Sequence, residues 1–220
     1  MLIVGVDEAG RGPVLGPLVM AALSIEEKDI KKLEWLGVKD SKLLSSSARE
    51  EMFERLREIV ADFRVEMVEP DAIDLSLSET NSNLNWLEAD TSARMVSELN
   101  ADKIILDCPS INLQAYEAYF KDKLSPHLKK NAELIVEHKA DMNYLIVAAA
   151  SIVAKVIRDR HINHLKTETG IDFGSGYMSD PKTQKFLENY HDTHPHLFRK
   201  KWQSYKNALI KKEQRSLGDF

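Results

Sequence analysis

The sequence predicts an α/β fold, that is, a sheet with helices packed against it. Short apolar runs typical of buried strands alternate with longer segments whose apolar residues recur at helical spacing. Two of the strand-like runs, Leu2–Val6 and Lys103–Asp107, lead into or end in carboxylates. At 220 residues the chain is long enough for one sizeable domain with a small appendage.

The N-terminal part is predicted to form a hairpin. Leu2–Val6 is a buried strand, and the glycines and prolines of residues 10–17 exclude a helix in the segment that follows. Leu18–Ile25 is close enough in the chain to pair with the first strand. A capping box formed by Ser47 and Glu50 is then expected to begin a helix.

Helices and strands alternate through the rest of the chain. Apolar residues at helical spacing predict helices over Met52–Phe63, Trp86–Leu99, Leu113–Leu128 and Asp141–Leu165. The polar stretch Asp71–Asn85 is predicted to be a loop or a short helix. Short apolar runs predict strands at Lys103–Asp107 and Glu133–Val136. The chain becomes glycine-rich after residue 170 and helical again from Pro181, which predicts a core over 1–170, a helical C-terminal part over 171–212 and a tail over 213–220.

The charge balance argues at first against a polyanionic partner. The formal net charge is −5, whereas phosphate binding normally leaves a basic footprint. The charges are segregated, however, because His191–Phe220 holds seven basic and three acidic side chains. The last 30 residues therefore carry a positive charge, and the whole-chain value does not exclude nucleic acid.

The composition also limits the cellular context. The single Cys108 excludes an internal disulfide framework and a cysteine-based zinc site. The N-terminus meets Asp7 too soon for a signal peptide, and the longest apolar run, Tyr144–Ala154, is too short to span a membrane. We expect a soluble, cytoplasmic monomer with no membrane contact.

Four carboxylates stand at predicted strand ends or helix starts: Asp7, Glu8, Asp107 and Asp141. Ligand sites of α/β sheets collect at the carboxyl ends of strands, where converging acids repel one another unless cations neutralise them. Oxygen ligands alone suit Mg²⁺ or Mn²⁺, and such a cluster fits two-metal phosphoryl chemistry. The alternative is that these acids are solvated caps. Because Asp7 and Glu8 are adjacent, both serve one site only if the strand ends or bulges there.

The glycine loop after these acids does not fit a nucleotide-binding fingerprint. Leu15 occupies the position of the third glycine, and no Walker-type Gly-Lys-Ser/Thr sequence follows Gly10-Arg11-Gly12. A dinucleotide or ATP site is therefore not expected.

Several blocks of the sequence, in order, resemble ribonuclease HII, the type 2 ribonuclease H, and are most similar to its archaeal branch. The blocks are Gly5–Pro13, Val38–Lys42, Glu137–Asp141, Ala149–Asp159 and Gly174–Pro181. The resemblance implies a ribonuclease H-like mixed sheet flanked by helices, with a small helical C-terminal extension. It also implies endonucleolytic cleavage of RNA in RNA/DNA hybrids and 5′ to ribonucleotides embedded in duplex DNA, leaving 3′-OH and 5′-phosphate ends.

The resemblance assigns roles to individual residues. The metal-binding carboxylates of the family, which hold two Mg²⁺ or Mn²⁺ ions, fall on Asp7, Glu8, Asp107 and Asp141. The segment that contacts ribose 2′-OH groups falls on Gly10, Arg11 and Gly12, where glycines let backbone groups approach a sugar closely. The tyrosine at the RNA-to-DNA junction falls on Tyr177.

Other residues are candidates for contacts with phosphates or with a partner protein. Lys42 and Arg49 are expected phosphate contacts, and Lys155 is a further candidate unless it forms a salt bridge with Asp159. In the tail, Gln214, Leu217 and Phe220 resemble the box that binds the sliding clamp, PCNA. An unstructured terminus is the alternative.

Two other functions are compatible with the same acids. A metal-dependent DNA nuclease or resolvase, also tethered to a clamp, would share the carboxylates but would need no 2′-OH contact. Gly10–Gly12 and Tyr177 argue against it. A hybrid-binding module without activity is disfavoured by the intact set of four carboxylates.

Overall fold

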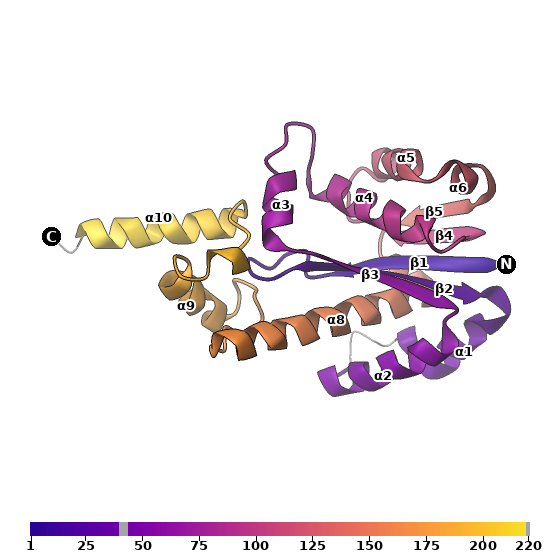
Figure 1. The fold of residues 1–220 in the computed structure, drawn as a ribbon, viewed down its shortest axis with the longest axis horizontal. Helices are drawn as coiled ribbons and strands as arrows, with labels where there is room; N and C mark the ends of the chain where they lie inside the picture. Colours follow the sequence, from indigo (N-terminus) through magenta and orange to yellow (C-terminus); the bar gives the residue numbers. More distant parts are fainter. Residues whose placement is uncertain (40–43, 219–220) are drawn as a thin grey trace.

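The computed structural model describes residues 1–39 and 44–218, with residues 211–218 described by their backbone alone. At its centre is a five-stranded sheet in the order β3-β2-β1-β4-β5 (Figure 1). The strands are β1 (Leu2–Ala9), β2 (Leu18–Glu26), β3 (Asp62–Val68), β4 (Lys103–Asp107) and β5 (Glu133–Glu137). β1, β2 and β3 pair antiparallel, whereas β4 runs parallel to both β1 and β5. The predicted α/β fold with a mixed sheet is confirmed.

Strand β1 does not end at Val6, as predicted, but continues through both carboxylates. The register pairs Asp7 with Ala21 and Glu8 with Met20 of β2. In a regularly paired strand, successive side chains leave on opposite faces of the sheet. The prediction that the strand ends before Asp7 is therefore wrong, and the expected condition that it ends or bulges there is not met. The side chains of Asp7 and Glu8 leave on different faces, yet the charges of Asp7 and Asp107 still act on Glu8.

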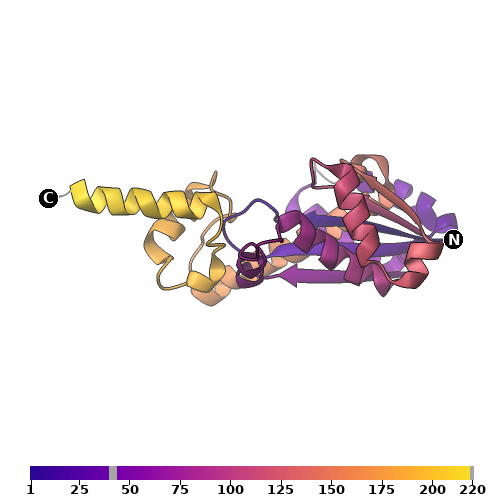
Figure 2. The ribbon, with the colours of Figure 1, turned by 90° about the horizontal axis from the view of Figure 1, so that it is seen from above.

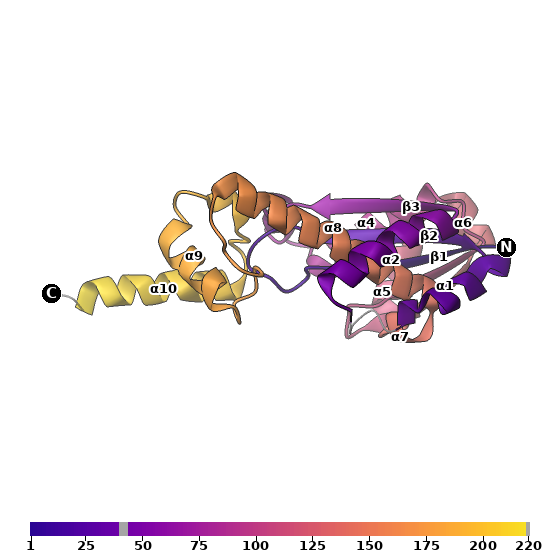
Figure 3. The same ribbon diagram turned by 90° about the horizontal axis from the view of Figure 1, so that it is seen from below.

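Helices cover both faces of the sheet (Figures 1 and 3). One face is covered by α1 (Ile30–Leu36), α2 (Ser46–Ile59) and α8 (Leu145–Thr169), and the other by α4 (Leu84–Ser97), α5 (Leu113–Lys123) and α6 (Pro126–Asn131). Helix α8 lies so close to β1 that a Cβ atom at Gly5 would be 2.6 Å from the carbonyl carbon of Ile146. Glycine at this position, opposite the backbone of Ile146 and Val147, permits the close packing.

The start and end of α2 differ from the prediction. Its N-cap is Ser45, whose side chain accepts a hydrogen bond from the backbone N–H of Ala48, so the predicted capping box of Ser47 and Glu50 is wrong. The helix ends at Ile59, and Phe63 belongs to β3. Local periodicity missed this strand because it is defined by pairing with β2, a tertiary contact.

Two helices predicted as continuous are each broken. Leu113–Leu128 divides into α5 and α6, because Ser125 caps α6 and Pro126 occupies its first turn. The helix predicted from Asp141 divides into α7 (Ala140–Asn143) and α8, with Tyr144 extended between them. The polar stretch after β3 contains the short helix α3 (Pro70–Ser76), and a short 3-10 turn, η1 (Glu27–Asp29), precedes α1.

The C-terminal part packs beside the end of the sheet towards which β1 runs (Figures 1 and 2). It contains α9 (Pro181–Tyr190), the 3-10 turn η3 (Pro195–Leu197) and α10 (Gln203–Gly218). Its core includes Phe173, Phe186 and Phe198, together with Val14 and Leu15 from the loop between β1 and β2. Helix α10 extends away from the rest of the molecule and runs across the expected boundary between residues 212 and 213.

None of the helices in the part of the chain that the structure describes is long and apolar enough to cross a membrane.

Candidate active site

Three of the four predicted carboxylates meet at the C-terminal ends of the neighbouring strands β1 and β4. Asp7 and Glu8 lie near the end of β1, and Asp107 is the last residue of β4, one position beyond Leu106, which pairs with Val6. The charge of Asp107 raises the pKa of both Asp7 and Glu8, which places all three within electrostatic range of one another. The parallel pairing of β1 and β4 brings these acids together.

Asp7 faces α8. Its side chain is 6% exposed and bonds to the hydroxyl of Ser151, which also accepts a hydrogen bond from Lys155 Nζ at 2.5 Å. Burial, with a smaller contribution from Asp107, raises the pKa of Asp7 to about 6, although the Ser151 bond and the Glu8 N–H oppose the rise. Lys155 therefore lies beside the acids, and no ion pair with Asp159 forms: Asp159 pairs with Arg49 at 3.1 Å.

Glu8 faces the layer of α4. Burial is the main cause that raises the pKa of this carboxyl well above its usual range, followed by the charges of Asp7, Glu88 and Asp107. Glu88, on α4, is itself completely buried, and burial raises its pKa to about 7. Glu88 carries no signal in the sequence, because at its helical position it is indistinguishable from a surface glutamate.

Asp141 lies in the first turn of α7 and lines a pocket with Gly37 and Met142, not the pocket that Glu8 lines. The backbone N–H of Ala140 donates to Asp107 Oδ1 at 2.7 Å, which ties the start of α7 to the end of β4. Asn143 and Tyr144 bond to the Glu137 carboxylate at the end of β5. The chain enters α7 through Lys139, a non-glycine residue with φ +58°. These contacts bring Asp141 to the same edge of the sheet as Asp107.

The donor set fits hard divalent cations. Among the side chains that the structure describes, those of residues 1–39 and 44–210, no three Asp, Glu, His or Cys side chains are yet arranged closely enough to hold a metal ion. The acids of β1 and β4 offer oxygen atoms only, and burial and like charge both disfavour their ionised forms. A divalent cation between them would remove that repulsion, and carboxylate oxygens are the ligands that Mg²⁺ and Mn²⁺ prefer.

The loop between β1 and β2 forms hydrogen bonds with Arg199 of the C-terminal part and with Glu88 of α4. Arg199, completely buried, donates to the carbonyl oxygens of Gly10 at 2.6 Å, Arg11 at 3.0 Å and Gly16 at 2.9 Å. The Arg11 side chain turns to α4, where its Nε donates to both oxygens of Glu88 at 2.9 and 3.1 Å. Gly10 has φ +83°, and a Cβ there would be 2.3 Å from Arg158 Nε, so only glycine fits.

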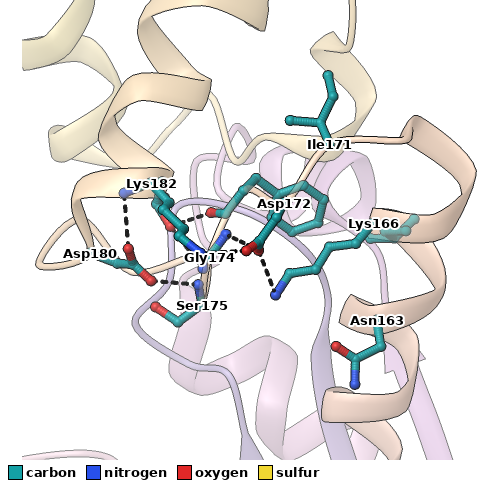
Figure 4. A network of polar contacts seen from close by, with 12 residues as sticks. Asn163, Lys166, Ile171, Asp172, Gly174, Ser175, Asp180 and Lys182 are labelled. Atoms are coloured by element: carbon teal, nitrogen blue, oxygen red, sulfur yellow. Dashed lines mark hydrogen bonds and ion pairs between the residues drawn. The ribbon is translucent and has the colours of Figure 1, made fainter.

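Many polar contacts hold the loop that precedes α9 (Figure 4), and Tyr177 belongs to this loop in the sequence. Asp172 pairs with Lys166 of α8 and Lys182 of α9 and accepts the N–H of Gly174, and these contacts lower its pKa. Asp180 accepts the N–H of Ser175 at 2.8 Å and caps α9. The tyrosine ring, 39% exposed, lies 5.5 Å from the Arg158 guanidinium.

A cleft of about 450 Å³ lies between the end of β1, the glycine loop and the loop that carries Tyr177. Its lining includes Glu8, the Gly10–Gly12 loop, Lys155, Arg49 and Tyr177. The structure therefore brings a carboxylate, the glycine loop, cationic side chains and the aromatic ring around one cleft. The Arg49 guanidinium already has partners within the protein, since it donates hydrogen bonds to Leu44 O at 2.7 Å and to Asp159.

Some predicted residues lie beyond what the structure describes. Lys42 and Phe220 are outside the described residues, and Gln214 and Leu217 are described only as backbone positions in α10. Arg199 was missed by the sequence analysis, which counted it only among the basic residues of the C-terminal segment. Nothing in its local sequence distinguishes a buried arginine from a surface one.

Comparison with known proteins identifies the family. The model of the family Ribonuclease HII matches residues 4–205. A Ribonuclease HII of Methanococcus maripaludis is 46% identical over 97% of this chain and 88% of its own length. The crystal structure of ribonuclease H2 from Pyrococcus horikoshii superposes with a TM-score of 0.87 at 39% identity, covering 97% of this chain and 99% of that one. RNase HII of Archaeoglobus fulgidus, solved as a PCNA:RNase HII complex, has a TM-score of 0.82 at 35% identity, covering 92% and 96%.

Proposed function

The chain belongs to the ribonuclease HII family, and on this premise we propose how its own residues carry out the reaction. The family membership makes it a type 2 ribonuclease H, an endonuclease that hydrolyses the RNA strand of RNA/DNA hybrids. The expected resemblance to archaeal members is confirmed by the relatives from Methanococcus and Pyrococcus. The observation that carries the mechanism is the meeting of Asp7, Glu8 and Asp107 beside a cationic cleft.

We propose that Asp7, Glu8, Asp107 and Asp141 hold two divalent cations. The cations would supply an activated water and stabilise the leaving oxygen, which leaves 3′-OH and 5′-phosphate ends. Ser151 orients the Asp7 carboxylate by a hydrogen bond, and the Ala140 N–H orients that of Asp107. Lys155 provides a positive charge beside Asp7 that attracts a substrate phosphate.

The glycine loop and the tyrosine would select the substrate. Gly10, Arg11 and Gly12 line the same cleft as Glu8, which supports a contact of their backbone groups with a ribose 2′-OH. Tyr177 lines the same cleft from the opposite loop, where its ring would stack on the neighbouring deoxyribose. Arg49, and Lys42 in the undescribed segment, would contact phosphates.

The deciding experiment is incubation with a duplex that contains one ribonucleotide, in Mg²⁺, Mn²⁺ or EDTA. We expect a nick on the 5′ side of the ribonucleotide in either metal and none in EDTA. No nick in either metal would overturn the two-metal proposal. Equal cutting of an all-DNA duplex would instead favour the metal-dependent DNA nuclease or resolvase, which needs no 2′-OH contact.

We further propose that the C-terminus binds a PCNA sliding clamp through Gln214, Leu217 and Phe220. The relative from Archaeoglobus fulgidus was solved as a complex with PCNA, and α10 projects away from the body of this molecule. Deletion of residues 214–220 should abolish capture by the clamp in a pull-down and leave nicking of a short duplex unchanged. Ser216→Ala is the matched control inside the segment. Unchanged capture after the deletion would disprove this contact.

A further inference from the structure

Arg199 has an unusual place in the molecule. It lies in the C-terminal part, yet its guanidinium reaches back over more than 180 residues to the loop between β1 and β2. The side chain is completely buried and donates to three backbone carbonyl oxygens, those of Gly10, Arg11 and Gly16. The Trp202 ring covers the guanidinium at 4.9 Å. A planar fork of donors suits such a set of acceptors, whereas a lysine ammonium cannot reach all three.

These bonds determine which backbone groups the loop presents. The described residues contain no cis peptide bond, and in a trans peptide the C=O and the following N–H point in opposite directions. Because the carbonyl groups of Gly10 and Arg11 point at Arg199, the N–H groups of Arg11 and Gly12 point away from it. Both residues line the cleft. The loop thus turns these two carbonyl groups towards Arg199 and the two N–H groups that follow them away from it.

We infer that Arg199 is a specificity-determining positioning residue, which orients the Gly10–Gly12 backbone so that its N–H groups donate to a ribose 2′-OH. This inference rests on the proposed function of the loop. A 2′-OH accepts such a bond, whereas the 2′-hydrogen of a deoxyribose cannot. Arg199 therefore contributes to sugar recognition without lining the cleft itself.

The loop is attached by other contacts that do not involve the guanidinium. Arg199 N–H donates to Val14 O at 2.9 Å, Val14 N–H donates to Gly176 O at 3.0 Å, and Gly16 N–H donates to Leu197 O at 2.9 Å. Replacing the side chain leaves these backbone bonds in place. We therefore expect variants of Arg199 to fold while the carbonyl groups of Gly10 and Arg11 lose their fixed direction.

The test measures discrimination rather than activity alone. Two duplexes identical except for one 2′-OH are bound to the full-length protein in Ca²⁺, and the ratio of the two Kd values is compared between proteins. In Arg199→Lys the Kd for the all-DNA duplex divided by the Kd for the duplex with the 2′-OH should fall on the order of tenfold, which corresponds to the free energy of roughly one hydrogen bond. The affinity for the all-DNA duplex should not change. Both Kd values come from one preparation, so the ratio does not depend on the folded fraction.

The control variant is Lys201→Gln, which removes an exposed positive charge from the same segment. It should weaken both affinities together and leave the ratio unchanged. If Arg199→Lys does not fold, Trp202→Leu decides by the same ratio, which should fall roughly two- to fivefold with loss of the ring over the guanidinium.

Two results would be decisive against the inference or against its premise. An unchanged ratio in a folded Arg199 variant, or an equal loss of both affinities, overturns the role of Arg199. A ratio of one in the unaltered protein overturns the proposed function of the loop instead.

Discussion

The acidic end of the sheet and the adjacent glycine loop are built in opposite ways. At the acidic end, burial and the charge of Asp107 raise the pKa of Asp7 and of Glu8. In the loop, the carbonyl groups of Gly10 and Arg11 are satisfied by Arg199. In the proposed function, the chemistry would depend on cations that compensate a repulsive cluster, whereas sugar recognition would depend on a backbone already fixed by the fold.

The strongest test of the comparison removes one charge from the acidic end. Asp107→Asn keeps an oxygen that can accept the Ala140 N–H, but it withdraws a charge from the proposed metal site. Nicking of a duplex with one ribonucleotide should fall roughly a thousandfold or more, since several kcal/mol of transition-state stabilisation are lost. Single-turnover kinetics measure the loss. Asp122→Asn, at an exposed ion pair with Lys129, is the control, and retained activity in Asp107→Asn would exclude Asp107 from the site.

The second test adds the cations. If the acidic end requires them, Mn²⁺ at about 100 times its Kd should raise the free energy of unfolding by about 2.7 kcal/mol. Thermal unfolding with Mn²⁺ and with EDTA measures the difference, and the gain should be smaller in Asp107→Asn. An equal gain in both proteins would show that the stabilising ion binds elsewhere.

The third test concerns Glu88, the buried acid that links the two regions. Its folded pKa of about 7 lies above the usual 4.5, so the folded state holds its proton more tightly than the unfolded state does. The contribution of the Glu88 carboxyl to the free energy of unfolding is therefore fully present below about pH 4.5, and it is lost as the pH rises through 7.

Glu88→Gln cannot lose a proton and keeps an acceptor for Arg11. The variant should match the unaltered protein at pH 5 and exceed it at pH 8 by on the order of 1 kcal/mol. Urea unfolding at both pH values measures this difference. A variant that is less stable at pH 8 would show that the ionised pair with Arg11 outweighs the burial of charge.

The smallest expected effect concerns Lys139, at the entrance to α7. Its φ of +58° is costly for a residue with a Cβ, and glycine adopts that region freely. Lys139→Gly should stabilise the protein by roughly 0.5 kcal/mol, after subtraction of the entropy that glycine loses on folding. Lys130→Gly, inside helix α6, should destabilise it by a similar amount. Destabilisation by Lys139→Gly in urea unfolding would indicate that the lysine side chain contributes a contact that outweighs the strain.

Much of the fold was predictable because its evidence is local. Strands β2, β4 and β5 agree closely with their apolar runs, and helix α4 agrees with its periodic stripe. Strand β3 was not predictable, since Asp62–Val68 follows helix α2 almost directly and becomes a strand only by pairing with β2. The breaks at Ser125 and Tyr144 were also missed, because the apolar pattern continues through them.

The same division holds for the site. The positions of the four acidic residues at predicted strand ends and helix starts were features of the sequence itself, and its resemblance to a known family added the glycine loop and Tyr177 as candidates. Only the tertiary structure decided that Asp7 and Glu8 start from opposite faces of the sheet, that Glu88 is buried beside them, and that Arg199 holds the loop. The physical reason is that burial and hydrogen-bond partners depend on what packs against a residue, and here those partners come from segments up to 189 positions away.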